Sequence, residues 1–193
     1  MWVLLQPRDY INGLQLFVGL ILLYASFLVV RPEVVAPAMR DNVPDGTPGI
    51  FPLLFVTVAC GAISGFHGIV ASGTSSKQLD KETDARFVGY FGAVGEGLLA
   101  LGTIVATTAG FRTVMEWEEI YNKWNAGGVD AFIEGGGRLM HDGLGIPTSL
   151  SGTILATMAV LFAATTMDSG VRLQRLVVAE TVSYTHLTLP TNR

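Results

Sequence analysis

The residues of this chain best suited to chemistry lie inside stretches that carry almost no charge. Ser64 and His67 fall within Ile50 to Ser76, a run without Asp, Glu, Lys or Arg. Glu96 is the only charged residue between Phe87 and Phe111. A hydroxyl can cap a helix end, and an imidazole can donate a hydrogen bond or relay a proton. A carboxylate in an apolar span is costly to keep ionised, so Glu96 is the expected proton-coupling group.

Glycines interrupt the same uncharged run. Gly61, Gly65 and Gly68 fall within eight residues, and each costs up to about 1 kcal/mol relative to alanine in a helix. Irregular backbone at membrane depth is tolerated only where it is buried in protein or lines a cavity. We expect unwinding over Cys60 to Gly65, so that a half-helix beginning near Phe66 presents free N–H groups to a carboxylate. The expected substrate-binding residues are Ser64, Gly65, Phe66 and His67.

Each of these features also has a purely structural interpretation. Small residues at helical spacing let neighbouring helices approach closely, as Gly89, Ala93 and Gly97 would on the next apolar segment. His67 could bond to a carbonyl of an adjacent helix. Glu96 could be a structural carboxyl hydrogen-bonded across a helix interface. The residues alone leave both interpretations open.

Four segments are apolar enough to hold these residues in a bilayer. Half of the residues are hydrophobic and only 15% are charged, against roughly 25% in a typical soluble domain. The charges lie between the apolar segments, whereas a soluble bundle would carry them along one face of each helix. Because about 20 apolar residues cross the hydrocarbon core, we predict an all-α polytopic membrane bundle with spans at residues 11–30, 50–73, 87–111 and 146–167.

Lysine and arginine in the connections set the expected orientation. Six lie in the short segments 1–10, 77–86 and 168–180, and five lie in the longer segments 31–49 and 112–145. We therefore place the N-terminus, the 77–86 loop and the C-terminal end in the cytoplasm.

The connection at 112–145 is the one sizeable aqueous piece. Aromatic and apolar residues recur at helical spacing within 116–124, which predicts a short amphipathic helix on the membrane face. Gly135 to Gly137 are expected to break the helix that Val129 to Glu134 would form. His141 to Gly143 are expected to form a polar turn in which the glycine supplies an unusual dihedral.

Several other kinds of function are not favoured. The single cysteine excludes a disulfide framework, and GAVGEG at 92–97 lacks the preceding strand and following lysine of a phosphate loop. His67 and His141 have no third metal ligand in view, and no basic cluster suits nucleic acid. We therefore expect no catalytic residues, no cofactor, no metal and no nucleic-acid partner.

Four motifs in the same order resemble the carbon starvation protein A (CstA) family. The central one is the glycine-rich run Phe51 to Lys77, and the others are PRDY at 7–10, DARFVGY at 84–90 and TMDSGVR at 166–172. The resemblance covers roughly residues 1 to 180. It implies a multi-pass inner-membrane protein with a LeuT-like inverted-repeat fold, in which residues 50–76 open the second repeat. It also implies a fragment of a longer protein, whose missing helices would complete the substrate site.

The resemblance further implies a secondary transporter that imports pyruvate or short peptides during carbon starvation. Both solutes carry the carboxylate that the expected site would hold, so the sequence does not choose between them. The alternative is a non-transporting subunit with a sensory or assembly role, whose spans only pack. A packing module needs neither Glu96 nor a broken helix, and a site near the midplane is typical of inverted-repeat carriers. The sequence therefore favours transport.

The last residues, Ser183 to Arg193, differ from everything before them. SYTHLTLPTNR resembles the peptide that arises when sequencing-adapter DNA is translated by mistake. A polar, threonine-rich end is also typical of an ordinary frayed terminus. We predict a native domain at 1–182 and a non-native tail at 183–193 that is exposed, extended or poorly ordered.

Overall fold

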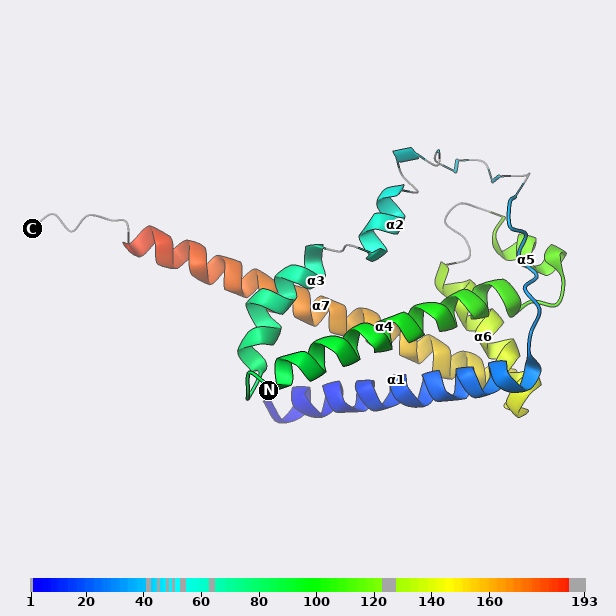
Figure 1. Ribbon diagram of the computed structural model, residues 1–193, viewed down its shortest axis with the longest axis horizontal. Coiled ribbons are helices and arrows are strands. Elements are labelled where there is room, and N and C mark those ends of the chain that lie inside the picture. The colour runs from blue at the N-terminus through cyan, green and yellow to red at the C-terminus, as the bar shows by residue number, and fades with distance from the viewer. Residues whose placement is uncertain are drawn as a thin grey trace, which may run out of the picture. The chain divides into compact units, whose positions relative to one another are not determined.

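The computed structural model describes residues 2–40, 43–44, 46–47, 49, 51–52, 55–62, 65–122 and 128–187. All regular structure in these ranges is helical, which confirms the predicted all-α class. The longer helices are α1 (Trp2–Val30), α4 (Asp84–Ala109), α6 (Gly128–Leu144) and α7 (Thr148–Leu187) (Figure 1). The shorter elements are α2 (Phe55–Ala62), α3 (Gly65–Val70), the π-helix η2 (Ala71–Ser75), the 3-10 helix η3 (Ser76–Gln78) and α5 (Val114–Ile120).

Three helices are long and apolar enough to cross a membrane. They contain the candidate spans Tyr10–Val30, Asp84–Ala109 and Thr148–Val182, which correspond to three of the four predicted ranges. The predicted span at 50–73 is instead divided among α2, α3 and η2. At about 1.5 Å per residue, none of these pieces reaches across a hydrocarbon core of about 30 Å. The described residues thus contain three continuous candidate spans, and the span predicted at 50–73, which the sequence expects to be interrupted, stays a prediction.

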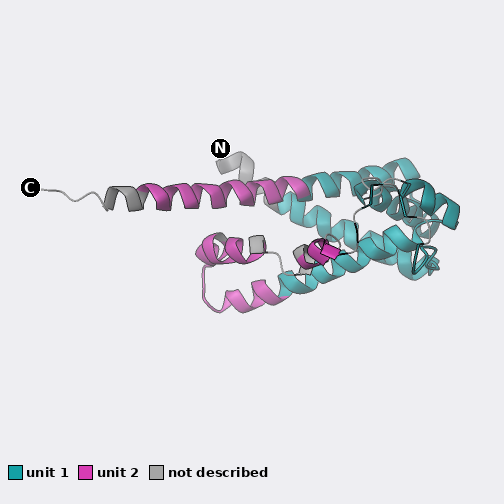
Figure 2. Ribbon diagram, turned by 90° about the horizontal axis from the view of Figure 1, so that it is seen from above, with its two compact units in different colours: residues 1–48, 91–162 teal, residues 49–90, 163–193 magenta. Residues whose placement is uncertain are grey.

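The chain divides into two compact units (Figure 2). Unit 1 comprises Met1–Pro48 and Phe91–Phe162, and unit 2 comprises Gly49–Tyr90 and Ala163–Arg193. The helices α4 and α7 each contribute one part to each unit.

The core of unit 1 forms where α6 meets α1, α4 and the first part of α7. Its buried residues come from all four helices, and α1 and α6 pack against each other. Ser151 on α7 is fully buried, and its hydroxyl donates to the Gly137 carbonyl of α6 at 2.9 Å. The core cluster consists of Leu23, Ala106, Phe132, Met140, Leu155 and Met158.

The glycines of α6 do not break it, contrary to the sequence prediction. Gly135 to Gly137 are buried in the middle of a continuous helix from Gly128 to Leu144. A Cβ at Gly135 would collide with the carbonyl oxygen of Ala106, and one at Gly136 would lie 2.7 Å from Leu155 Cδ1. Packing against neighbouring backbone therefore outweighs the low helix propensity of glycine.

The predicted turn at His141 to Gly143 is also wrong, because these residues form the last turn of α6. Gly143 is needed for a close helix contact, since a Cβ there would lie 2.9 Å from the Cα of Ser26 on α1. The positive φ of 68° belongs to Gly145, just after the helix end, which is the usual place for a left-handed glycine.

Unit 2 contains α2, α3, η2, η3, the first turns of α4 and the second part of α7. Here η2 packs on α7: a Cβ at Gly73 would lie 2.9 Å from Leu176 Cδ2 and 3.7 Å from Leu173 Cδ1. The backbone of 183–187 continues α7 as a helix and is therefore not extended, which was one of the three states predicted for the tail (exposed, extended or poorly ordered). Residues 188–193 lie outside the described residues, and the non-native origin of the tail stays a prediction.

Candidate functional site

The predicted site residues lie around the junction of α2 and α3. Gly61 is in α2, whereas Gly65, Phe66, His67 and Gly68 are in α3. Helix α2 ends at Ala62 and α3 begins at Gly65. Ser64 lies outside the described residues, as does the side chain of Phe66. The predicted unwinding at Cys60 to Gly65 therefore stays a prediction.

His67 is the predicted residue for which the structure shows a polar setting. Its exposed side chain lines a cavity of about 270 Å³ in unit 2. One wall comes from α3 and η2, and the other comes from the second part of α7. The remaining lining residues are Val70, Ala71, Ser75, Thr165, Thr166 and Ser169.

The wall beside His67 is built on irregular helix. Ala71 to Ser75 form a π-turn between α3 and η3, and such segments occur frequently at functional sites. Ser72 donates to the Ile69 carbonyl at 3.1 Å and Ser76 donates to the Ser72 carbonyl at 2.7 Å. These local side-chain bonds satisfy backbone groups on the exposed side of the turn. The sequence singled out His67, but it gave no sign that η2 or α7 lies beside it.

Glu96 is placed differently from His67. It lies in the part of α4 that belongs to unit 1, its side chain is exposed, and it is not among the residues that line the cavity. A Cβ at Gly92, Gly95 or Gly97 would meet no atom within 4 Å. This stretch of α4 therefore has open space beside it in the part of the chain that the structure describes.

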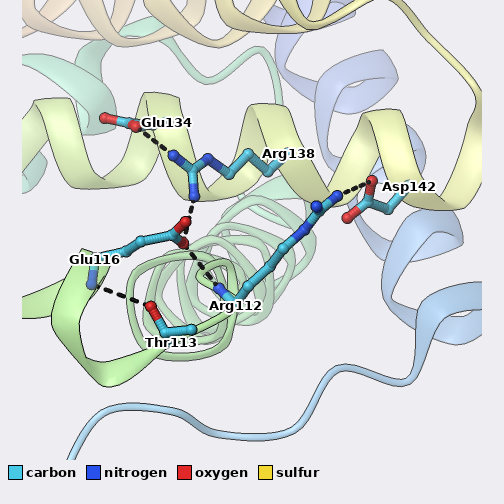
Figure 3. Close-up of polar contacts among 6 residues, drawn as sticks. All are labelled: Arg112, Thr113, Glu116, Glu134, Arg138 and Asp142. Atoms are coloured by element: carbon cyan, nitrogen blue, oxygen red, sulfur yellow. Dashed lines mark hydrogen bonds and ion pairs between the residues drawn. The ribbon is translucent and has the colours of Figure 1, made fainter.

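A second polar group, which we call the α5–α6 cluster, lies in unit 1 (Figure 3). Arg138 is its centre: Nη1 lies 2.7 Å from Glu116 Oε2, and Nη2 lies 2.8 Å from Glu134 Oε1. Arg112 pairs with Asp142 at 3.3 Å. The cluster thus ties α5 and the connection between α4 and α5 to one face of α6.

Glu116 also organises the start of α5. The Glu116 N–H donates to the hydroxyl of the N-cap residue Thr113 at 3.3 Å, and the Arg112 N–H donates to Glu116 Oε2 at 3.2 Å. The Arg112 N–H, followed by the hydrogen bond and charge of Arg138, lowers the pKa of Glu116, although desolvation opposes this. A Thr-x-x-Glu pattern is the signature of a capping box. Sequence reasoning missed it, although Thr113 and Glu116 show that spacing.

The segment after α1 is bound to the same region. The Val35 N–H donates to the Thr108 carbonyl at 3.0 Å, and Arg40 Nη1 donates to the Tyr121 carbonyl at 2.7 Å. The Arg40 guanidinium also lies 5.5 Å from the centre of the Trp117 ring. A short helix is present in this region as α5 (Val114–Ile120), which overlaps the range predicted at 116–124. Its contact with a membrane stays a prediction.

The comparisons with known proteins agree with these helices. The family described as carbon starvation protein CstA matches residues 1–115, which include α1 to α4. The match ends before the TMDSGVR motif at 166–172. No solved structure matches the chain.

Three curated relatives show what has been assigned to similar proteins. The pyruvate/proton symporter BtsT of Escherichia coli (strain K12) is 43% identical over 113 residues. The peptide transporter CstA of the same strain is 39% identical over 109 residues, and that of Helicobacter pylori (strain ATCC 700392 / 26695) is 44% identical over 109 residues. The alignments cover 54–55% of this chain but only 16% of each relative.

The family match covers more than half of this sequence, and the three apolar helices suit an integral membrane protein. The chain belongs to the carbon starvation protein CstA family.

Proposed function

We propose that this chain is part of a secondary active carrier of the inner membrane that imports pyruvate or short peptides, coupled to protons. The strongest support is the chain's membership of a family whose relatives are named as peptide transporters and as a pyruvate/proton symporter. The candidate spans in α1, α4 and α7 and the polar cavity beside His67 support this proposal. The chain acts as a carrier rather than as an enzyme.

The chain functions together with further helices of a longer protein. It spans 16% of the length of the relatives that it matches, and the stretch of α4 around Glu96 has open space beside it. The proposal also holds that the full-length carrier has a LeuT-like inverted-repeat fold and that the N-terminus of this chain lies in the cytoplasm. Those further helices would complete the site.

The solute's carboxylate binds near the start of α3, at Ser64, Gly65, Phe66 and His67. Because α3 is only six residues long, the proposal relies on the imidazole of His67 in its cavity and not on the dipole of a long helix. Glu96 carries the coupling proton.

Uptake by the full-length carrier tests the function directly. Cells that lack other carriers would be given labelled pyruvate or a labelled dipeptide, with and without a proton gradient. Saturable, gradient-dependent uptake of either solute is the expected result. The alternative, a subunit with a sensory or assembly role whose spans only pack, requires that neither solute accumulate.

A further inference from the structure

One face of α7 changes from apolar to polar along its length in unit 2. Thr165, Ser169, Leu173 and Leu176 follow one another at intervals of four, four and three residues, which places them on the same side of a helix. Leu173 and Leu176 are the residues that a Cβ at Gly73 of η2 would meet. Thr165 and Ser169 line the cavity that also contains His67. Leu173 and Leu176 thus pack η2 against α7. The hydroxyl groups of Thr165 and Ser169 lie one to three helical turns before these leucines and face the cavity.

From this arrangement, and resting on the proposed function, we propose that Thr165 and Ser169 form the second wall of the substrate site and donate hydrogen bonds to the carboxylate of a small solute. The family match ends at residue 115, so it assigns nothing to these two residues.

The chemistry of the cavity suits an anion better than a cation. Of the seven described residues that line it, four carry a hydroxyl group, one carries an imidazole and two are apolar, and none is Asp or Glu. Hydroxyl and imidazole N–H groups can donate to a carboxylate, and hydrogen bonds to a charged group are stronger than those between neutral groups. A cation site would instead need carboxylate or carbonyl oxygens directed into the space.

The hydroxyl of Ser169 can exchange one partner for another. It donates to the Thr165 carbonyl at 3.2 Å, a bond within the same helix that serine and threonine commonly make. Rotation toward a bound carboxylate would give up this neutral bond for a charge-assisted one. The helix needs no rearrangement for this exchange.

The volume limits the size of the solute. Pockets for drug-sized ligands have volumes of roughly 300–1,000 Å³, and this cavity has about 270 Å³. A three-carbon keto acid or the carboxyl end of a dipeptide fits such a space. We therefore assign the site to small monocarboxylates.

Substitutions on α7 of the full-length carrier test the inference. Thr165→Val and Ser169→Ala each remove one donor, and each should raise the KM for labelled pyruvate or dipeptide about tenfold, with little change in the maximal rate. Thr165→Ser keeps the hydroxyl and should keep the wild-type KM. The matched control is Thr157→Val on the same helix. Thr157 is exposed, donates to the Thr153 carbonyl at 2.7 Å and does not line the cavity, so its KM should not change.

The outcomes separate the inference from the function on which it rests. If the wild-type carrier transports either solute but Thr165→Val and Ser169→Ala leave KM unchanged at normal membrane levels, the α7 wall is wrong and the function stands. A changed dependence on the coupling ion with an unchanged KM would also overturn the inference. If the wild-type carrier transports neither solute, both proposals fail. If Thr165→Val does not reach the membrane, the KM values of Ser169→Ala and Thr165→Ser test the inference instead.

Discussion

Glycine has opposite surroundings in α6 and in α3. In α6, Gly135 and Gly136 are buried, and an added Cβ would press on the backbone of α4 or on a leucine of α7. In α3, a Cβ at Gly68 would meet no atom within 4 Å. Gly135 and Gly136 therefore permit close packing between helices, whereas Gly68 lies in open space beside His67, which lines the cavity.

The difference shows what glycine does in each setting. A glycine that contacts backbone is required by its neighbours, because backbone atoms cannot move aside as the end of a side chain can. A glycine in open space lowers helix stability without any gain in packing. Within the described residues Gly68 makes no packing contact that requires glycine, which agrees with the proposal that this segment unwinds.

The largest expected effect is on transport. Gly65→Leu in the full-length carrier should restore a strong helix former at the α2–α3 junction and abolish uptake of pyruvate and dipeptide, if the junction must unwind. His67→Ala should retain uptake with a raised KM or with a weaker dependence on the proton gradient. Initial rates of labelled solute uptake measure both. Normal uptake in both variants, at normal protein levels, would place the site elsewhere.

The next effect concerns the open stretch of α4. If Glu96 carries the coupling proton, Glu96→Gln should eliminate accumulation driven by a pH gradient while solute exchange continues, because an amide cannot take up and release the proton. Counterflow and gradient-driven uptake in the same vesicles separate the two activities. Unchanged pH dependence would leave Glu96 with the structural role that the sequence also allowed.

A smaller effect is expected on folding in unit 1. Gly135→Ala should lower the free energy of unfolding by about 2 to 3 kcal/mol, because its Cβ would collide with the Ala106 carbonyl oxygen in a tightly packed contact. Gly68→Ala is the matched control and should be neutral or slightly stabilising. Denaturant unfolding of this chain in detergent measures both. Equal stability of the two variants would refute the contrast between the two sets of glycines.

The sequence predicted the helical class and three of the apolar segments because those signals are local. Apolar runs with at most one charge in α1, α4 and α7 are visible without knowledge of any partner. The course of α6 could not be predicted in this way: Gly135 is a helix breaker in isolation and becomes a packing residue only beside Ala106. His67 was identified from its own type and position, whereas Thr165 and Ser169 are ordinary hydroxyls of an apolar helix until η2 lies beside them.

The smallest expected effect is the pH dependence of the α5–α6 cluster. The pKa of Glu116 is lowered in the folded chain, first by the Arg112 N–H and then by Arg138, although desolvation opposes this. A carboxyl with a lower pKa when folded stabilises the fold above its unfolded pKa and loses that contribution as the pH falls through the folded pKa. The thermal midpoint of wild type should therefore decline on acidification more than that of Glu116→Gln, with the difference vanishing below both pKa values. Glu118→Gln, an exposed glutamate of the same helix, should follow wild type. Parallel pH profiles for wild type and Glu116→Gln would mean that the ionised Glu116 side chain adds no stability to the fold.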